Sequence, residues 1–218
     1  MLKKINDIEL YYEEFGEGKP LIMLHGNGEN LEIFYKLIDK LKDNYKIYAI
    51  DSRNHGKSTK TEDYSYTTMA SDIEEFIKGL DGGKANVLGF SDGAIISILI
   101  ALKSPEIQEK LILLGPNLKA KNLKSELLDV IRNKYVATGD PLLKLMLSEP
   151  KIELEEFKGL ENEILLVFGE NDIFKEEFVE EISNSVKNGK AINLKGHDHM
   201  SYIIDNDMLA EDIIEFIG

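Results

Sequence analysis

The sequence predicts an α/β fold built on a mostly parallel, doubly wound sheet. Short apolar runs alternate with stretches whose apolar residues recur at helical spacing, as in strands joined by crossover helices. The run at residues 20–24 is apolar throughout, which is typical of a parallel strand buried on both faces. The length of 218 residues, 43% of them apolar, suits one sizeable core. We therefore expect a single domain over residues 1–218.

The expected strands are short and spread along the whole chain. The first, Glu9–Glu14, reads as an antiparallel strand that precedes the buried run. Reactive groups of a parallel sheet gather at the carboxyl ends of its strands, so the residues that follow each run are the candidates for chemistry. Further strands are expected at Tyr45–Ile50, Ala85–Gly89, Lys110–Leu114, Glu163–Phe168 and Lys190–Leu194.

Helical stripes occupy the gaps between these runs. Met69 and Ile73 lie on the apolar face of the segment 67–80. Residues 94–102 are apolar almost all round, which predicts a buried helix that Pro105 ends. Further helices are expected over residues 31–41, 174–186 and 206–217.

Residues 117–157 break the alternation of strands and helices. They carry patterns for two short helices, Leu123–Tyr135 and Leu142–Leu147, and have little strand character. We expect a small helical cap inserted over the sheet. Its apolar side chains can pack the cap or line a pocket, and the pattern favours neither role for Leu123, Leu127, Leu143 and Met146.

Composition and charge narrow the class of partner. The 26 basic and 40 acidic residues give a net charge of −14, which repels nucleic acids and anionic membranes. Because the chain has no cysteine, disulfides, thiolate metal sites and cysteine nucleophiles are excluded. The first residues turn polar at once, and no run approaches the roughly 18 apolar residues of a membrane span. We expect a cytoplasmic protein that acts on a small-molecule substrate, and its oligomeric state stays open.

The pentapeptide Gly-Phe-Ser-Asp-Gly at residues 89–93 lies between a strand run and a buried helix pattern. A G-x-S-x-G in this context predicts a sharp strand-to-helix turn that exposes the hydroxyl of Ser91. A serine is a poor nucleophile until a base takes its proton, and the base needs a carboxylate to orient it. Both partners occur after later strand runs: Asp172 at one turn, then His197 and His199 in the next loop.

A glycine-rich turn, His25-Gly26-Asn27-Gly28, follows the buried run. A tetrahedral oxyanion needs two backbone N–H donors. We expect one from Asn27 and the other from Asp92, which opens a helix whose N-terminus favours negative charge. The Asp92 side chain can complement that helix end, or it can face the pocket and favour a substrate with a positive group.

With these segments in place, the chain resembles the α/β-hydrolase superfamily from about residue 9 onward. The resemblance implies α/β-hydrolase topology, with Ser91 as nucleophile, Asp172 as acid and a histidine of the last loop as base. Two positions depart from the family pattern. Asn54 and Asp198 stand where glycines are usual, although asparagine tolerates a left-handed backbone. The matching segments are residues 25–28, 51–58, 89–93, 169–172 and 196–199.

Rivals exist for the base and for the acid. The family pattern places the base at the fourth position of a motif that begins with the glycine of the last loop, which selects His199 over His197. Glu170 and Asp198 compete with Asp172. Glu170 falls two residues earlier, and Asp198 adjoins His199 in sequence, where neighbouring side chains tend to point apart.

The remaining histidines, His25 and His55, belong to turn motifs, and we expect them to hold loops near the site. No ligand spacing such as H-E-x-x-H connects the histidines, so no zinc site is expected. The expected activity is that of a serine hydrolase. It cleaves a carboxylic ester, or a lactone or thioester, through an acyl-enzyme and needs no metal or organic cofactor. The alternatives are a ligand-binding sensor on the same fold and a cofactor-free haloperoxidase-like variant.

Overall fold

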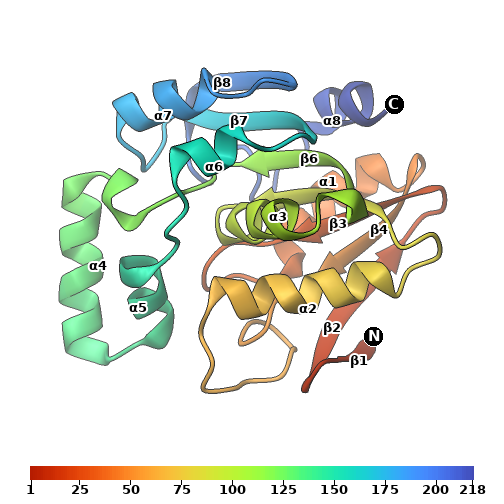
Figure 1. Cartoon of the computed structure of the whole chain (residues 1–218), viewed down its shortest axis with the longest axis horizontal. Helices are drawn as coiled ribbons and strands as arrows, with labels where there is room; N and C mark the ends of the chain where they lie inside the picture. The colour runs from red at the N-terminus through yellow and green to blue at the C-terminus, as the bar shows by residue number, and fades with distance from the viewer.

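The computed structural model describes all of residues 1–218, and its centre is one eight-stranded sheet in the order β1-β2-β4-β3-β5-β6-β7-β8 (Figure 1). Strand β1 (Leu2–Ile5) pairs antiparallel with β2 (Ile8–Phe15), which pairs antiparallel with β4. All the other pairs are parallel, so the predicted fold class is confirmed. The parallel strands are β3 (Lys19–Leu24), β4 (Tyr45–Ile50), β5 (Ala85–Phe90), β6 (Gln108–Leu114), β7 (Glu163–Asn171) and β8 (Gly189–Asp198).

Every expected strand is present, although several ends differ. β7 and β8 continue beyond their apolar runs because the ladder between them resumes at Asn171 and Asp198 after an irregular step. The sequence pattern does not predict β1, because only Leu2 and Ile5 of its four residues are apolar. It forms through pairing with β2, across a tight turn in which Asn6 has φ of 50°.

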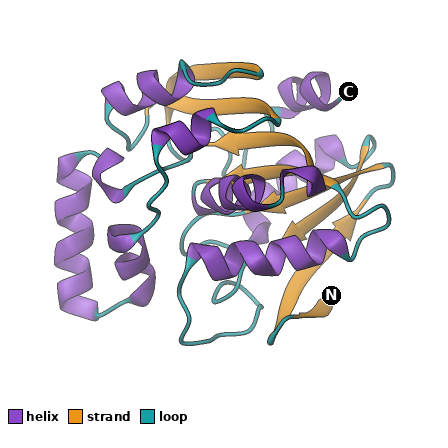
Figure 2. Cartoon of the chain, in the orientation of Figure 1, coloured by secondary structure: helices purple, strands orange, loops and turns teal.

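Helices cover both faces of the sheet (Figure 2). On one face, α1 (Tyr35–Leu41) and α8 (Ala210–Ile217) contact each other, and on the other lie α2 (Tyr66–Lys78), α3 (Asp92–Lys103) and α7 (Glu176–Ser183). Helix α3 is buried almost all round, as predicted, and ends before Pro105. The fold places its N-terminus against the end of β5, where the serine turn lies.

Four helices, α1, α4 (Ser125–Thr138), α7 and α8, begin later than the patterns suggest. Residues 31–34 form a 3-10 turn, η1 (Leu31–Phe34), before α1 begins. Asn206 stays outside α8 because its side chain accepts the Met208 N–H at 3.0 Å and donates to the Ser201 carbonyl at 2.7 Å. Local side-chain bonds of this kind compete with helical hydrogen bonds, which apolar spacing cannot reveal.

Residues 117–157, which we call the cap segment, lie between β6 and β7. They contain the 3-10 turn η3 (Ala120–Asn122) and the helices α4 (Ser125–Thr138), α5 (Pro141–Ser148) and α6 (Leu154–Lys158). Figure 1 shows α4 and α5 side by side, beyond one end of the sheet. Helix α6 is an addition to the two expected helices, and a capping box between Glu153 and Glu156 starts it. Membrane crossing is beyond the length and apolarity of every helix in the structure.

Candidate active site

The turn that carries Ser91 has a strained backbone. β5 ends at Phe90 and α3 begins at Asp92, and Ser91 between them has φ of 50° and ψ of −111°. Residues with a side chain rarely adopt this conformation, and such strain concentrates at functional sites. The Ser91 N–H donates to the Leu114 carbonyl at 2.8 Å, which anchors the turn to the end of β6. Ser91 therefore lies at the carboxyl edge of the parallel strands, as the sequence predicts.

The two motif glycines make this turn possible. A Cβ at Gly89 would lie 2.3 Å from the carbonyl oxygen of Gly93, and a Cβ at Gly93 would lie 2.1 Å from that of Leu24. Both separations are far below van der Waals contact, so any side chain would push β5, α3 and β3 apart. Backbone crowding around the serine thus explains why this motif requires glycine.

Three side chains from three strand ends meet at this turn. His199 Nε2 lies 3.1 Å from Ser91 Oγ, and His199 Nδ1 lies 2.7 Å from Asp172 Oδ1. Asp172 also accepts the N–H groups of Gly169 at 3.1 Å and Ile173 at 2.7 Å, which fix its carboxylate in the turn after β7. In this arrangement, which we call the triad, His199 can take the serine proton through one nitrogen while the other donates to Asp172.

The imidazole of His199 is confined on several sides. Its ring lies 4.9 Å from the ring of Phe90 and 5.4 Å from that of Phe174, between centroids. A Cβ at Gly115 would lie 2.6 Å from His199 Cε1. Sequence reasoning missed all three contacts. Only Gly115 left a signal, because it directly follows a buried strand run, as Gly26 nearly does after β3.

The rival residues serve local turns. His197 is half-buried and contacts Ser201 Oγ at 3.1 Å, while Glu170 accepts the Gly196 N–H at 2.7 Å. Asp198 accepts the N–H groups of residues 200 and 201, and these bonds hold the pKa of Asp198 below its usual range. None of the three rivals is hydrogen-bonded to Ser91 or to the imidazole of His199, whose carboxylate partner is Asp172.

His25 and His55 hold loops beneath the site. Both are buried, with ring centroids 5.0 Å apart. His25 Nε2 accepts the Ser52 N–H at 3.0 Å, so its Nδ1 donates to the Gly26 carbonyl at 2.8 Å. Burial lowers the pKa of His25 to about 3, which keeps the ring neutral. The structure contains no group of three or more His, Cys, Asp or Glu side chains that could hold a metal ion.

The loop at residues 51–58 tolerates its unusual asparagine. Asn54 has φ of 68°, the left-handed conformation that the family's glycine permits, and its side chain accepts the Thr61 N–H at 2.6 Å. Gly56 is required for a different reason, because its Cβ would lie 1.9 Å from Asp51 Oδ2. The Asp51 carboxylate in turn accepts the Leu31 N–H at 2.9 Å, which ties this loop to the chain after β3.

The two expected oxyanion donors are linked through their side chains. Asn27 Nδ2 donates to Asp92 Oδ2 at 2.9 Å, while the Asn27 N–H has no acceptor within the protein. The Asp92 N–H opens α3 and has no intrahelical acceptor. The Asp92 carboxylate does not cap the helix; it lines the pocket beside Ser91. Burial raises the pKa of Asp92, although hydrogen bonds from Asn27 and Tyr66 oppose the shift.

The pocket at Ser91 is narrow and acidic. Its cavity volume is only about 20 Å³, and its walls contain two carboxylates, Asp92 and Glu149, and no lysine or arginine. Glu149 accepts the Tyr66 N–H at 3.1 Å, at the N-terminus of α2. Of the cap side chains whose role the pattern left open, Leu123 and Met146 line this pocket. The other wall residues are Ile95, Asn117, Ile173 and Phe174.

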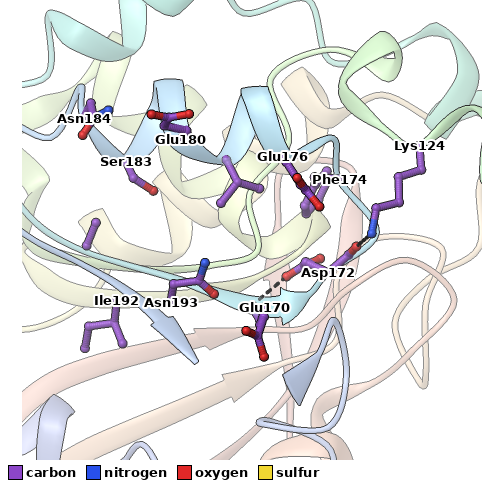
Figure 3. A pocket seen from close by; sticks show the side chains of 13 residues that line it. Lys124, Glu170, Asp172, Phe174, Glu176, Glu180, Ser183, Asn184, Ile192 and Asn193 are labelled. Atoms are coloured by element: carbon purple, nitrogen blue, oxygen red, sulfur yellow. Dashed lines mark hydrogen bonds between the residues drawn. The ribbon is translucent and has the colours of Figure 1, made fainter. Parts of the chain in front are cut away.

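A wider groove lies on the other side of Asp172, between α7 and β8 (Figure 3). Glu170, Glu176 and Glu180 face it, and the Lys124 Nζ donates to the Asp172 carbonyl at 2.5 Å. Ser91 is not among its lining residues. Phe174 lines both this groove and the pocket at Ser91, so the two are neighbours.

Comparison with known proteins identifies relatives that share this architecture. The family model described as alpha/beta hydrolase fold matches residues 19–142, more than half of the chain. The sn-1-specific diacylglycerol lipase ABHD11 of Danio rerio is 31% identical over 116 residues, which cover 51% of this chain and 37% of that protein. The AB hydrolase superfamily protein YisY of Bacillus subtilis (strain 168) is 34% identical over 117 residues, which cover 52% and 44%.

A solved structure extends the likeness to the full chain. Carboxylesterase CesB from Bacillus subtilis matches with a TM-score of 0.82 at 18% identity, over 100% of this chain and 90% of that one. At this identity the likeness concerns the fold. The chain spans only 37% and 44% of the length of the two sequence relatives above.

Proposed function

Because this chain belongs to the α/β-hydrolase family, we propose that it is a serine hydrolase that cleaves a carboxylic ester, a lactone or a thioester of small to medium size. The observation that supports this most strongly is the triad, in which His199 lies within hydrogen-bond distance of both Ser91 and Asp172. A nucleophile, a base and an orienting carboxylate in this order are the parts that acyl transfer to serine requires.

The proposed reaction begins when His199 Nε2 takes the proton of Ser91 Oγ as that oxygen attacks the carbonyl carbon. The N–H groups of Asn27 and Asp92 receive the oxyanion, and Asp172 stabilises the charged imidazole. His199 then gives the proton to the leaving oxygen or sulfur, and the carbonyl–leaving-group bond breaks. Water, deprotonated by His199, attacks the acyl-enzyme, and the acid leaves as Ser91 regains its proton.

Pocket size and charge limit the acyl group. A cavity of about 20 Å³ leaves little free space beside Ser91, which favours a small acyl group, and the carboxylates of Asp92 and Glu149 disfavour an anionic one. Because no lysine or arginine of the pocket neutralises these carboxylates, neutral and cationic acyl groups fit its chemistry better.

The test is hydrolysis of p-nitrophenyl acetate and p-nitrophenyl butyrate, with and without a fluorophosphonate probe. Turnover that disappears as the probe modifies Ser91, located by peptide mass analysis, supports the serine hydrolase. Absence of turnover across a broad panel of esters, lactones and thioesters, together with tight binding of one of them, indicates a sensor instead. Halide oxidation without acyl transfer indicates the haloperoxidase-like variant.

A further inference from the structure

Glu29 is a carboxylate close to Ser91 that the proposed reaction does not use. Its side chain is half-buried, and its hydrogen-bond partner is the N–H of Gly26, at 3.0 Å. The titratable groups whose charges act on it are His199, from the loop after β8, and Asp92, from α3. No lysine or arginine compensates its charge. An ion pair therefore does not explain why a carboxylate lies at this position.

The hydrogen bonds of Glu29 with the local backbone suggest one role for this residue. The Glu29 N–H donates to the Gly26 carbonyl at 3.3 Å, and Gly28, the third residue of the resulting four-residue turn, has φ of 72°. The Glu29 side chain returns to the N–H of the same Gly26. One residue thus binds both polar groups of Gly26, and Asn27, whose N–H is free, lies inside the turn that Glu29 closes.

The same carboxylate lies against the nucleophile turn. A Cβ built on Gly26 would be 2.8 Å from Glu29 Oε2 and 3.1 Å from Ser91 Cβ. The two side chains therefore lie close to the same position. The ring of Phe90 lies 3.3 Å from that position and closes the space on the third side. The charge of Glu29 is therefore next to the place where the reaction develops an oxyanion and an imidazolium.

Building on the proposed serine-hydrolase function, we infer that Glu29 is a positioning residue of the oxyanion hole. Its carboxylate holds the Gly26 N–H, and with it the turn that presents the Asn27 N–H to the substrate oxygen. Glu29, Asp172, Asp92 and Asp198 are the carboxylates that lie close enough to interact with the imidazole of His199. Burial raises the pKa of Glu29 to about 6, so its charge changes within the range where enzymes of this class are assayed.

The experiment compares Glu29→Gln with Glu29→Ala. The glutamine keeps an oxygen that can accept the Gly26 N–H but carries no charge, whereas the alanine loses both. We expect Glu29→Ala to lower kcat for p-nitrophenyl acetate about tenfold or more with little change in KM, since a misplaced oxyanion donor affects the transition state. Glu29→Gln should restore kcat to near the unsubstituted level, while its kcat/KM profile should lose the inflection near pH 6 that the titration of Glu29 contributes.

The matched controls are Glu32→Gln and Glu32→Ala, which make the same changes at an exposed glutamate three residues further on. Both should leave kcat and the pH profile unchanged. The proposal is overturned if Glu29→Ala retains full kcat, if glutamine and alanine lose activity equally, or if the pH profile of Glu29→Gln matches that of the unsubstituted protein. Thermal unfolding of each variant separates these outcomes from loss of the fold.

A second measurement does not depend on turnover. In the unsubstituted protein, the NMR signals of the Gly26 and Asn27 amides should shift with pH around a midpoint near 6, and this titration should be absent in Glu29→Gln. If neither the unsubstituted protein nor any variant cleaves an ester, the proposed function fails, and the role of Glu29 in the oxyanion hole fails with it. The amide titration then still decides whether Glu29 holds the turn. Amides that do not titrate would overturn the contact itself.

Discussion

At the residue scale, Gly115 illustrates how closely His199, the proposed base, is confined. It follows β6 with φ of 55°, and a Cβ there would lie 2.6 Å from His199 Cε1 and 2.9 Å from Nδ1. Gly139 has nearly the same backbone, with φ of 67°, but a Cβ there would meet nothing within 4 Å. The pair separates the cost of the backbone conformation from the cost of displacing the imidazole.

We expect Gly139→Ala to lose roughly 1–2 kcal/mol of stability from the left-handed backbone alone, and Gly115→Ala to lose more because its methyl group also meets His199. Only Gly115→Ala should also lower kcat, because its methyl group pushes His199 away from Ser91 and Asp172. Chemical denaturation and ester hydrolysis measure the two effects. Equal activity in both variants would show that the imidazole has room to adjust.

We expect the largest losses of activity from substitutions of the triad residues. Ser91→Ala, Asp172→Asn and His199→Ala should each lower kcat about 10³-fold or more without unfolding the protein. His197→Ala is the matched histidine control, since that side chain contacts Ser201 instead of the serine nucleophile. Steady-state kinetics with circular dichroism spectra check these outcomes. Loss of activity in His197→Ala but not in His199→Ala would reassign the base.

At the element scale, Glu74 joins the two helices that cover one face of the sheet. Its carboxylate on α2 is nearly buried and binds Lys103 Nζ at 2.6 Å, Ser104 Oγ at 2.8 Å and Lys78 Nζ at 2.8 Å. Burial alone would raise the pKa of Glu74, but these three hydrogen bonds outweigh it and lower the pKa to about 2. The joint holds α2 against the end of α3, whose start carries the serine turn.

The lowered pKa gives the joint a defined pH dependence. A carboxyl that titrates near 2 when folded and near 4.5 when unfolded stabilises the fold above pH 4.5, and this contribution is lost as the pH falls towards 2. We expect Glu74→Gln to lose about 1–2 kcal/mol at pH 7, a value reduced because both lysines are partly exposed. Urea denaturation at pH 7 and pH 3 measures the difference, which should shrink at pH 3. Glu75→Gln, an exposed neighbour, should change stability little at either pH.

At the scale of the whole molecule, the surface charge and the pocket charge have the same sign. The net charge is −14, and the pocket contributes Asp92 and Glu149. Fields of this kind raise the encounter rate of cations and are screened by salt over about 10 Å at 0.1 M. The protein as a whole should therefore attract a cationic substrate towards an acidic pocket.

We expect kcat/KM for butyrylthiocholine, relative to its neutral 3,3-dimethylbutyl thioester isostere, to fall as NaCl rises from about 20 mM to about 500 mM. The isostere serves as the control for shape and chemistry. Steady-state assays at several salt concentrations check the ratio. A ratio that does not change with salt would mean that the charge of the molecule plays no part in substrate capture.

Much of this architecture could be predicted from sequence because its signals are local. The alternation of apolar runs and stripes gave the parallel sheet, and the crowding at Gly89 and Gly93 leaves a motif that is readable without coordinates. β1 escaped prediction because pairing with β2, rather than its own composition, makes it a strand. The contacts of Phe174 with His199 and of Glu29 with Gly26 depend on how distant or folded-back segments meet, which no periodicity records.

The division of labour between sheet and cap segment has a consequence for how such a protein diversifies. The proposed reactive groups lie at strand ends where backbone crowding forbids most replacements, as at Gly93. Part of the substrate wall, including Leu123, Met146 and Glu149, comes instead from residues 117–157. Evolution, or a protein engineer, can therefore exchange the wall for a new substrate while inheriting the chemistry unchanged.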